Sequence, residues 1–166
     1  MTLIIVQFIA LMVMTAELIQ ILSQYGKETV SAIQSNLAST GTNATGKTSQ
    51  SVRYEIKQEG TKTTLKLVGK PFIAVVETGR KPTPEYKPSE AFVESIQEWM
   101  NAKGVDGSAY GIAQAIHKEG TKLFRDGGRK DIISNVINQN LIDRISNDLL
   151  VKFAQQFLQS VIQVWR

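Results

Sequence analysis

The sequence contains no cysteine and a single histidine, His117, among its 166 residues. The lack of cysteine excludes disulfides, thiolate nucleophiles and cysteine-rich zinc sites, and one histidine argues against a histidine-based metal site within a single chain. No apolar run reaches the length of about 20 residues that a helix needs to cross a bilayer, since the run at residues 3–14 is too short. Only Met1 and Thr2 precede that run, and no cleavage pattern of small residues follows it. We therefore expect a soluble protein without a signal peptide and without a membrane contact.

The remaining composition is typical of a globular chain, with 42% hydrophobic and 20% charged residues. The length of the chain predicts one domain over residues 1–166. The net charge of +4 is uneven, because residues 41–88 carry nine basic and four acidic residues, an excess of five. We therefore expect a basic surface on the middle third of the chain.

Apolar periodicity predicts both helices and strands. Residues 15–40 repeat apolar side chains every three or four positions, as an amphipathic helix does, and follow an apolar N-terminal segment at residues 1–14. Residues 51–57 and 63–68 alternate apolar and polar side chains around a turn at Gly60, which is typical of two half-buried antiparallel strands.

The rest of the chain completes an expected α+β fold. Residues 72–76 are all apolar, and we interpret them as a third strand, covered on both faces, of an antiparallel sheet within residues 50–79. Residues 80–88 hold three of the four prolines and predict an exposed loop. Caps and stripes predict two shorter helices within residues 89–126 and a long helix over residues 131–166, which lack proline and glycine. The expected fold is a long N-terminal helix packed on a small antiparallel sheet, followed by two shorter helices and a long C-terminal helix.

Residues 41–48 read GTNATGKT and satisfy G-x-x-x-x-G-K-[ST], the pattern of a phosphate-binding loop. Such a loop needs a strand before it and a helix after it, because its amides and the first helical turn together surround the phosphate. The order predicted here is helix, loop, strand. We therefore interpret the segment as a polar loop that ends the first helix, with a nucleotide-binding loop as the alternative.

Candidate catalytic residues are few. His117 is the only side chain suited to act as a base at neutral pH, and no serine or acid stands beside it at local spacing, so we interpret it as a packing or surface residue. Glu90, Glu94 and Glu98 recur every fourth position on one helix face. We interpret this ladder as a solvated face that could dock on a basic neighbour, and not as a metal site or an acid pair. We therefore expect no enzymatic activity, no cofactor and no metal.

Two apolar segments exceed what one small domain can bury. Residues 3–14 would be apolar on all sides in a helix, and residues 131–166 carry an apolar side chain at every fourth position with others beside it. Large exposed apolar patches are rare on soluble monomers, so we predict that both segments make subunit contacts. The alternative for residues 3–14 is an internal helix. The predicted contact residues are Leu3, Ile4, Ile5, Phe8, Phe157 and Trp165.

Four segments resemble a known family when they are read together. They are NATGKTSQSVRYEI, AVVETGRKP, PSEAFVESIQEWMNAKGV and AYGIAQAIHKEGTKLFRDGG. Their order and spacing over residues 15–128 resemble the tail-completion and neck proteins of tailed bacteriophages, the head-tail joining family also known as minor tail components. The matching residues are Thr45, Gly46, Lys47, Ser51, Glu77, Gly79, Pro88, Ile96, Trp99, Lys103, Gly104, Ala109, Ile112, Ala113, Ile116, Gly120 and Thr121.

The resemblance implies a structural protein of the virion neck or tail, made in the host cytoplasm. It implies a homo-oligomeric ring between the portal or its adaptor and the tail, through which DNA passes. In such a ring the outward cations of the hairpin would line the DNA channel or meet an acidic neighbour, the alternative being a solvated face. For the whole protein, the alternative is a small basic nucleic-acid- or nucleotide-binding protein. The predicted basic face consists of Arg53, Lys57, Lys62 and Lys66, with Lys47 at its start, and the predicted interface loop contains Arg80, Lys81 and Lys87.

Overall fold

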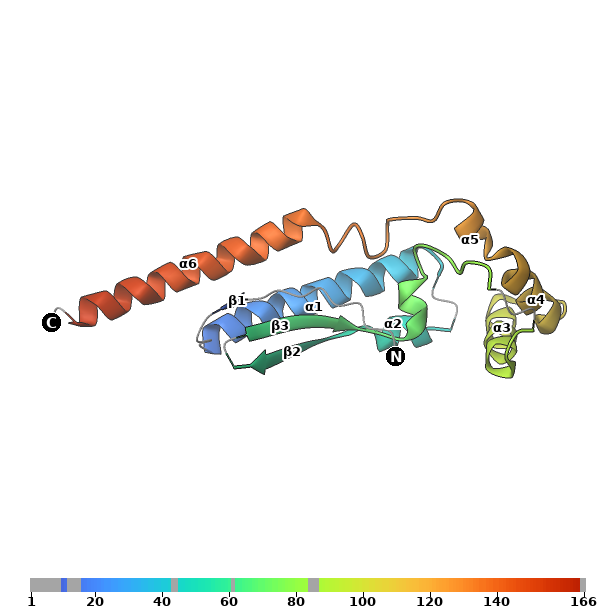
Figure 1. Ribbon diagram of the computed structural model, residues 1–166, viewed down its shortest axis with the longest axis horizontal. Helices are drawn as coiled ribbons and strands as arrows, with labels where there is room; N and C mark the ends of the chain where they lie inside the picture. The colour runs from blue at the N-terminus through green and yellow to red at the C-terminus, as the bar shows by residue number, and fades with distance from the viewer. Residues whose placement is uncertain (1–9, 12–15, 43–44, 61, 84–86, 165–166) are drawn as a thin grey trace.

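The computed structural model describes residues 10–11, 16–42, 45–60, 62–83 and 87–164, with the side chains of residues 10–11 and 159–164 excepted. The molecule is elongated, with α1 and α6 along its length, the sheet beside α1, and α3 and α4 at the end opposite the tip of α6 (Figure 1). The elements are β1 (Ala10–Leu11), α1 (Ala16–Ser39), α2 (Lys47–Ser51), β2 (Arg53–Glu59), β3 (Lys62–Val68), the 3-10 helix η1 (Pro71–Ala74), α3 (Glu90–Lys103), α4 (Ala109–Glu119), α5 (Lys122–Arg125) and α6 (Gln139–Val164). The predicted α+β fold, with a long N-terminal helix on an antiparallel sheet and a long C-terminal helix, is confirmed.

Helix α1 forms where the sequence predicts it, and its apolar stripe faces the sheet and α6. Its buried positions recur at helical spacing, and Gly26 among them lets the ring of Tyr54 on β2 lie against the helix backbone. A Cβ atom at Gly26 would stand 2.6 Å from that ring, so the close contact requires glycine. The buried positions of α1 are Leu18, Leu22, Tyr25, Gly26, Thr29, Ile33 and Leu37.

Strands β2 and β3 form the predicted hairpin, and its inner face packs on α1. Tyr54 pairs with Leu67 and Ile56 pairs with Leu65, so these four side chains share one face. On the other edge of β3, β1 pairs with residues Lys62 and Thr63 to complete the strand order β1-β3-β2. Residues 10–11 of the apolar N-terminal segment are therefore extended and not helical, while the rest of residues 3–14, including the predicted contacts Leu3, Ile4, Ile5 and Phe8, lies outside the described residues.

The prediction of a third strand at residues 72–76 is wrong. This run begins in η1 and continues into a turn, and Phe72 is 50% exposed while Ile73 is buried. Pro71 opens the helical turn, where its missing N–H costs nothing and its fixed φ suits the helix. A short apolar run cannot distinguish a buried strand from a helical turn, and here the proline decides between them.

The prediction that the C-terminal helix begins at residue 131 is also wrong. Residues 131–138 form turns, and α6 starts at Gln139, where the Asn138 side chain accepts a hydrogen bond from the Leu141 amide at 3.1 Å. Helix α6 then packs antiparallel to α1, as Arg144 lies 3.6 Å from Glu28 and Lys152 lies 4.0 Å from Glu17. One core cluster joins the two helices through Leu22, Tyr25 and Ile145. A larger cluster joins α1, the sheet, η1 and the turns before α6. Its buried residues are Ile33, Leu37, Val52, Leu67, Ile73 and Ile132.

Candidate functional site

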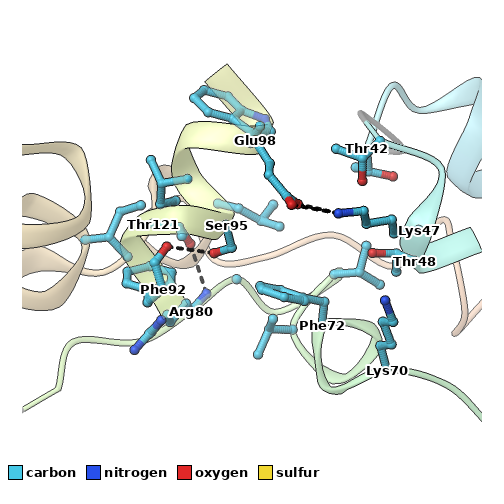
Figure 2. A pocket seen from close by; sticks show the side chains of 18 of the residues that line it. Thr42, Lys47, Thr48, Lys70, Phe72, Arg80, Phe92, Ser95, Glu98 and Thr121 are labelled. Atoms are coloured by element: carbon cyan, nitrogen blue, oxygen red, sulfur yellow. Dashed lines mark hydrogen bonds and ion pairs between the residues drawn. The ribbon is translucent and has the colours of Figure 1, made fainter. Parts of the chain in front are cut away.

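An apolar cleft of about 720 Å³ separates the α3–α4 end of the molecule from α2 and η1 (Figure 2). Local signals place its helical wall: Ser89 caps α3 by accepting the Phe92 amide, and Ser108 caps α4 by accepting the Gly111 amide. The two helices pack on each other and present apolar side chains toward η1. The apolar side chains that line the cleft are Phe72, Val75, Val76, Phe92, Ile96, Trp99, Ile112, Ile116 and Leu123.

Two large aromatic residues of the cleft remain open to solvent. Phe72, on the η1 wall, is 50% exposed, and Trp99, on the α3 wall, is 40% exposed. Aromatic side chains bury large areas when they are covered, and they are enriched at the centre of interfaces. The cleft therefore has the composition of a docking surface more than that of a polar active site.

Lysine side chains stand on the rim of the cleft. Lys47 contacts both carboxylate oxygens of Glu98, at 2.8 and 2.7 Å, and Lys103 donates to the Gly41 carbonyl at 3.0 Å (Figure 2). The first contact joins α3 to α2, and the second joins α3 to the loop before α2. Both partners of the Lys47–Glu98 pair are about half exposed, so the pair contributes little to stability and mainly fixes the position of two side chains. Lys70 lines the same cleft.

These contacts decide how the phosphate-loop pattern is used in the fold. Helix α1 precedes residues 41–48, as predicted, but the five-residue α2 follows Gly46, so the prediction that no helix comes next is wrong. The segment still lacks a strand before it, and the Lys47 amine contacts Glu98. Lys47 lies on the cleft rim and does not begin a basic sheet face, which corrects that expectation. In the glutamate ladder, Glu98 docks on a lysine of the same chain.

Arg80 is not part of an exposed loop, contrary to the prediction for residues 80–88. Its guanidinium lies 3.9 Å from the centre of the Phe92 ring and 3.0 Å from His117 Nε2, and burial lowers its pKa. Because a guanidinium can only donate, Nε2 accepts and the Nδ1–H of His117 donates to Thr83 Oγ1 at 2.8 Å. His117 is 5% exposed, so it is the packing residue that the sequence predicted. Lys81 and Lys87 are exposed, as expected.

The segments around Arg80 and Thr121, which both carry the family resemblance, meet beside the contacts of Arg80 with Phe92 and His117. Arg80 N–H donates to the Thr121 hydroxyl at 3.0 Å, and Thr121 N–H donates to the Arg80 carbonyl at 2.8 Å. Gly79 packs so closely here that a Cβ atom on it would lie 2.4 Å from the Phe124 nitrogen. These residues fix the loop to the start of α5, and their role in the described structure is architectural.

Sequence analysis missed the role of Glu77. Its carboxylate is 8% exposed and accepts the backbone amides of Ile132, Ile133 and Ser134 at 2.9, 2.6 and 3.0 Å, together with the Ser134 hydroxyl. Burial alone would raise the pKa of Glu77, but the four hydrogen bonds outweigh it and lower the pKa. Glu77 therefore stabilises the turns that precede α6. A signal was available in an acidic residue at the end of an apolar run, but its partners lie far along the chain.

The face of the hairpin that was predicted to be basic carries both basic and acidic side chains. Cross-strand partners share a face, and Glu55 pairs with Lys66 while Glu59 pairs with Lys62. Arg53 also contacts Glu55 at 3.1 Å. The outer face of the sheet, defined by these charges, therefore carries four cations and two carboxylates, a net charge of +2. Its charged residues are Arg53, Glu55, Lys57, Glu59, Lys62 and Lys66.

Residues 150–158 of α6 carry large apolar side chains that are exposed and do not pack on α1. Ile145 faces α1 in the first half of the helix, whereas in the second half Lys152 lies 4.0 Å from Glu17 and the Gln156 amide donates to Glu17 at 3.3 Å. The outward face of α6, defined as Leu150, Val151, Phe153, Phe157 and Leu158, is between 44 and 60% exposed. The predicted contact Phe157 belongs to this face, and Trp165 lies outside the described residues.

Among the described side chains, no group of three or more His, Cys, Asp and Glu residues is arranged to hold a metal ion. The helices within the described ranges are not long and apolar enough to span a bilayer. Comparisons of the chain with family models, with curated proteins and with solved structures found no match.

Proposed function

We propose that the protein is a structural component of a tailed-phage virion, which forms a homo-oligomeric ring in the neck or tail-completion region and joins the portal or its adaptor to the tail. The observation that carries the proposal is the outward face of α6, with five large apolar side chains that are 44–60% exposed in the isolated chain. Burying apolar area yields about 25 cal/mol per Å², so covering these side chains between copies offsets part of the cost of association. The kind of assembly that we propose, a ring in the neck or tail, is taken from the sequence resemblance.

The elongated shape also supports a ring component. Helices α3 and α4, which line the apolar cleft, lie at the end of the molecule opposite the tip of α6 (Figure 1). One copy therefore offers two separate apolar surfaces to its neighbours. The outer face of the sheet, with a net charge of +2, is the surface that DNA passing through such a ring would contact. We assign the protein no catalytic role.

Light scattering over a range of protein concentrations tests this function, followed by electron microscopy of negatively stained particles. We expect a defined oligomer above the 18.4 kDa mass of one chain, visible as a ring. Purified virions should contain the same protein at the head-tail junction. A chain that stays monomeric at every concentration, and that binds ATP or duplex DNA tightly on its own, would support the small nucleic-acid- or nucleotide-binding protein instead.

A further inference from the structure

Within α6 the apolar side changes direction after Leu149, the last apolar residue that packs on the core it shares with α1. In the first half the apolar side chain of Ile145 packs into the core with Leu22 and Tyr25, as expected for a helix that covers its own domain. Over residues 150–158 the polar side chains of Lys152 and Gln156 face α1, and the large apolar ones are exposed. A helix built only to cover its own protomer would keep its apolar side inward along its whole length.

The outward apolar residues have the spacing of a helix that binds in a groove. Leu150, Phe153, Ala154 and Phe157 stand at i, i+3, i+4 and i+7, the pattern by which an amphipathic helix anchors in an apolar groove. Figure 1 shows that α6 continues past the end at which α1 begins. The tip of the helix therefore projects beyond the core that holds its first half.

The cleft offers the matching surface at the other end of the molecule. It is lined mainly by apolar side chains from α3, α4 and η1, and Phe72 and Trp99 in it are 50% and 40% exposed. Because α3 and α4, which line the cleft, lie at the end of the elongated chain opposite the tip of α6 (Figure 1), the helix cannot fill the cleft of its own copy.

Charge also favours a contact between the C-terminal end of α6 and the cleft. The last carbonyl groups of a helix have no partners within the helix and carry partial negative charge, which cations stabilise. The last turn of α6 contains no basic residue, and the sequence from residue 153 to residue 164 contains no charged residue at all. The lining of the cleft contains the cations Lys47, Lys70, Arg80 and Lys103 against one carboxylate, that of Glu98, which pairs with Lys47, so its net charge is +3.

We infer that residues 150–158 of α6 of one copy dock in the cleft of the next copy, between η1 and α3, so that the subunits associate head to tail. This inference rests on the proposed function and names the contact that would close the ring. A head-to-tail contact uses two different surfaces, and repeating it around an axis yields a closed ring when the rotation permits. A contact between two equivalent α6 faces would instead yield a dimer with a twofold axis.

Two variants of the full chain separate these possibilities. The helix variant carries Leu150→Glu and Phe153→Glu and keeps an intact cleft, whereas the cleft variant carries Phe72→Glu and Trp99→Glu and keeps an intact helix. Matched controls place glutamate at exposed positions of α6 and α4 that lie outside both surfaces, Asn140→Glu and Tyr110→Glu. Circular dichroism and thermal melting of each variant establish that it is folded before light scattering is measured.

We expect each variant alone to be monomeric and both controls to assemble as the unchanged chain does. A 1:1 mixture of the two variants should form a species of twice the 18.4 kDa chain mass, because one intact helix can still enter one intact cleft. If the folded variants do not associate on mixing, or if the cleft variant assembles normally, the head-to-tail contact is wrong while the proposed ring stands. If the unchanged chain is monomeric at all concentrations, the contact and the proposed function both fail.

Discussion

The carboxylate of Glu77 accepts both the backbone amide and the hydroxyl of Ser134, a residue that sequence analysis places inside the C-terminal helix. With the amides of Ile132 and Ile133 also bound to Glu77, three successive N–H groups point at one carboxylate. The first amides of a helical turn have no partner within that turn, and here Glu77 binds them just before a turn that the Ile137 amide closes on the Ile133 carbonyl at 2.8 Å. This relationship joins the turns that precede α6, which begins at Gln139, to the turn that follows η1.

Replacing Glu77 with glutamine should destabilise the fold by about 2 kcal/mol, because hydrogen bonds to a charged acceptor contribute about 1.5–3 kcal/mol and the buried amides would lose part of their partner. Urea denaturation followed by circular dichroism measures the change. The control is Glu59→Gln on the exposed outer face of the sheet, which should change stability by less than about 0.5 kcal/mol. Equal effects for the two variants would show that the Glu77 contacts contribute nothing.

The same contacts predict a pH dependence. The pKa of Glu77 in the folded chain lies below its ordinary value of 4.5, so the folded state binds its proton less readily than the unfolded state does. Its contribution to stability is then fully present above about pH 4.5 and is lost as the pH falls through the folded pKa. We expect the stability difference between the unchanged chain and Glu77→Gln to be constant from pH 6 to pH 8 and to shrink below about pH 4.5. A difference that grows on acidification would contradict this sign.

Gly79→Ala should be far more harmful than a glycine substitution at an open position. Gly79 has a φ of 70°, and a Cβ atom there would lie 2.4 Å from the Phe124 nitrogen and 2.6 Å from Thr121 Oγ1. Gly127 has a φ of 87° with nothing within 4 Å, so Gly127→Ala measures the cost of the backbone conformation alone, about 1 kcal/mol. We expect Gly79→Ala to cost at least about 2 kcal/mol more, measured by thermal unfolding. Similar melting temperatures for the two variants would disprove the close contact.

How far the sequence predicts this structure depends on whether the deciding contact is local. The stripe of α1 and the alternation of β2 and β3 are read from neighbouring residues, and both predictions are confirmed. The contact between Glu77 and the turns before α6 is not predicted, because Glu77 is separated from Ser134 by more than 50 residues, and no local pattern indicates that it will bind these amides.

The cleft was equally beyond local reasoning. Its walls come from the loop before α2, from η1 and from α3 and α4, which meet only in the folded chain. Arg80 was placed in an exposed loop because of its neighbouring prolines, whereas its contacts with Phe92 and His117 depend on how α3 and α4 pack. The exposed apolar residues of α6, in contrast, can be predicted from the sequence. The sequence of this segment contains more apolar residues than one domain can bury.

The protein should not bind ATP, although residues 41–48 satisfy the phosphate-loop pattern. No strand leads into the loop, and the Lys47 amine that would reach a phosphate contacts both oxygens of Glu98. Calorimetry with ATP and magnesium should therefore detect no heat of binding. Lys47→Ala should change the free energy of unfolding by less than about 1 kcal/mol, because the ion pair is half exposed. Micromolar ATP affinity that disappears in Lys47→Ala would overturn this prediction.

Contact between duplex DNA and the outer face of the sheet should be weak and strongly dependent on salt. Four cations stand on this face together with Glu55 and Glu59, a net charge of +2, so about two phosphates can be neutralised and the slope of log K against log salt should be near −2. Lys57→Glu combined with Lys66→Glu reverses the sign of the face and should abolish the binding. Lys118→Glu, an exposed change on α4, should leave the binding unchanged. Fluorescence anisotropy with a labelled duplex at 50 and 200 mM salt measures all three proteins. If the double reversal leaves both DNA affinity and ring assembly unchanged, this face is merely solvated, and the DNA channel of the proposed ring must be lined by another surface.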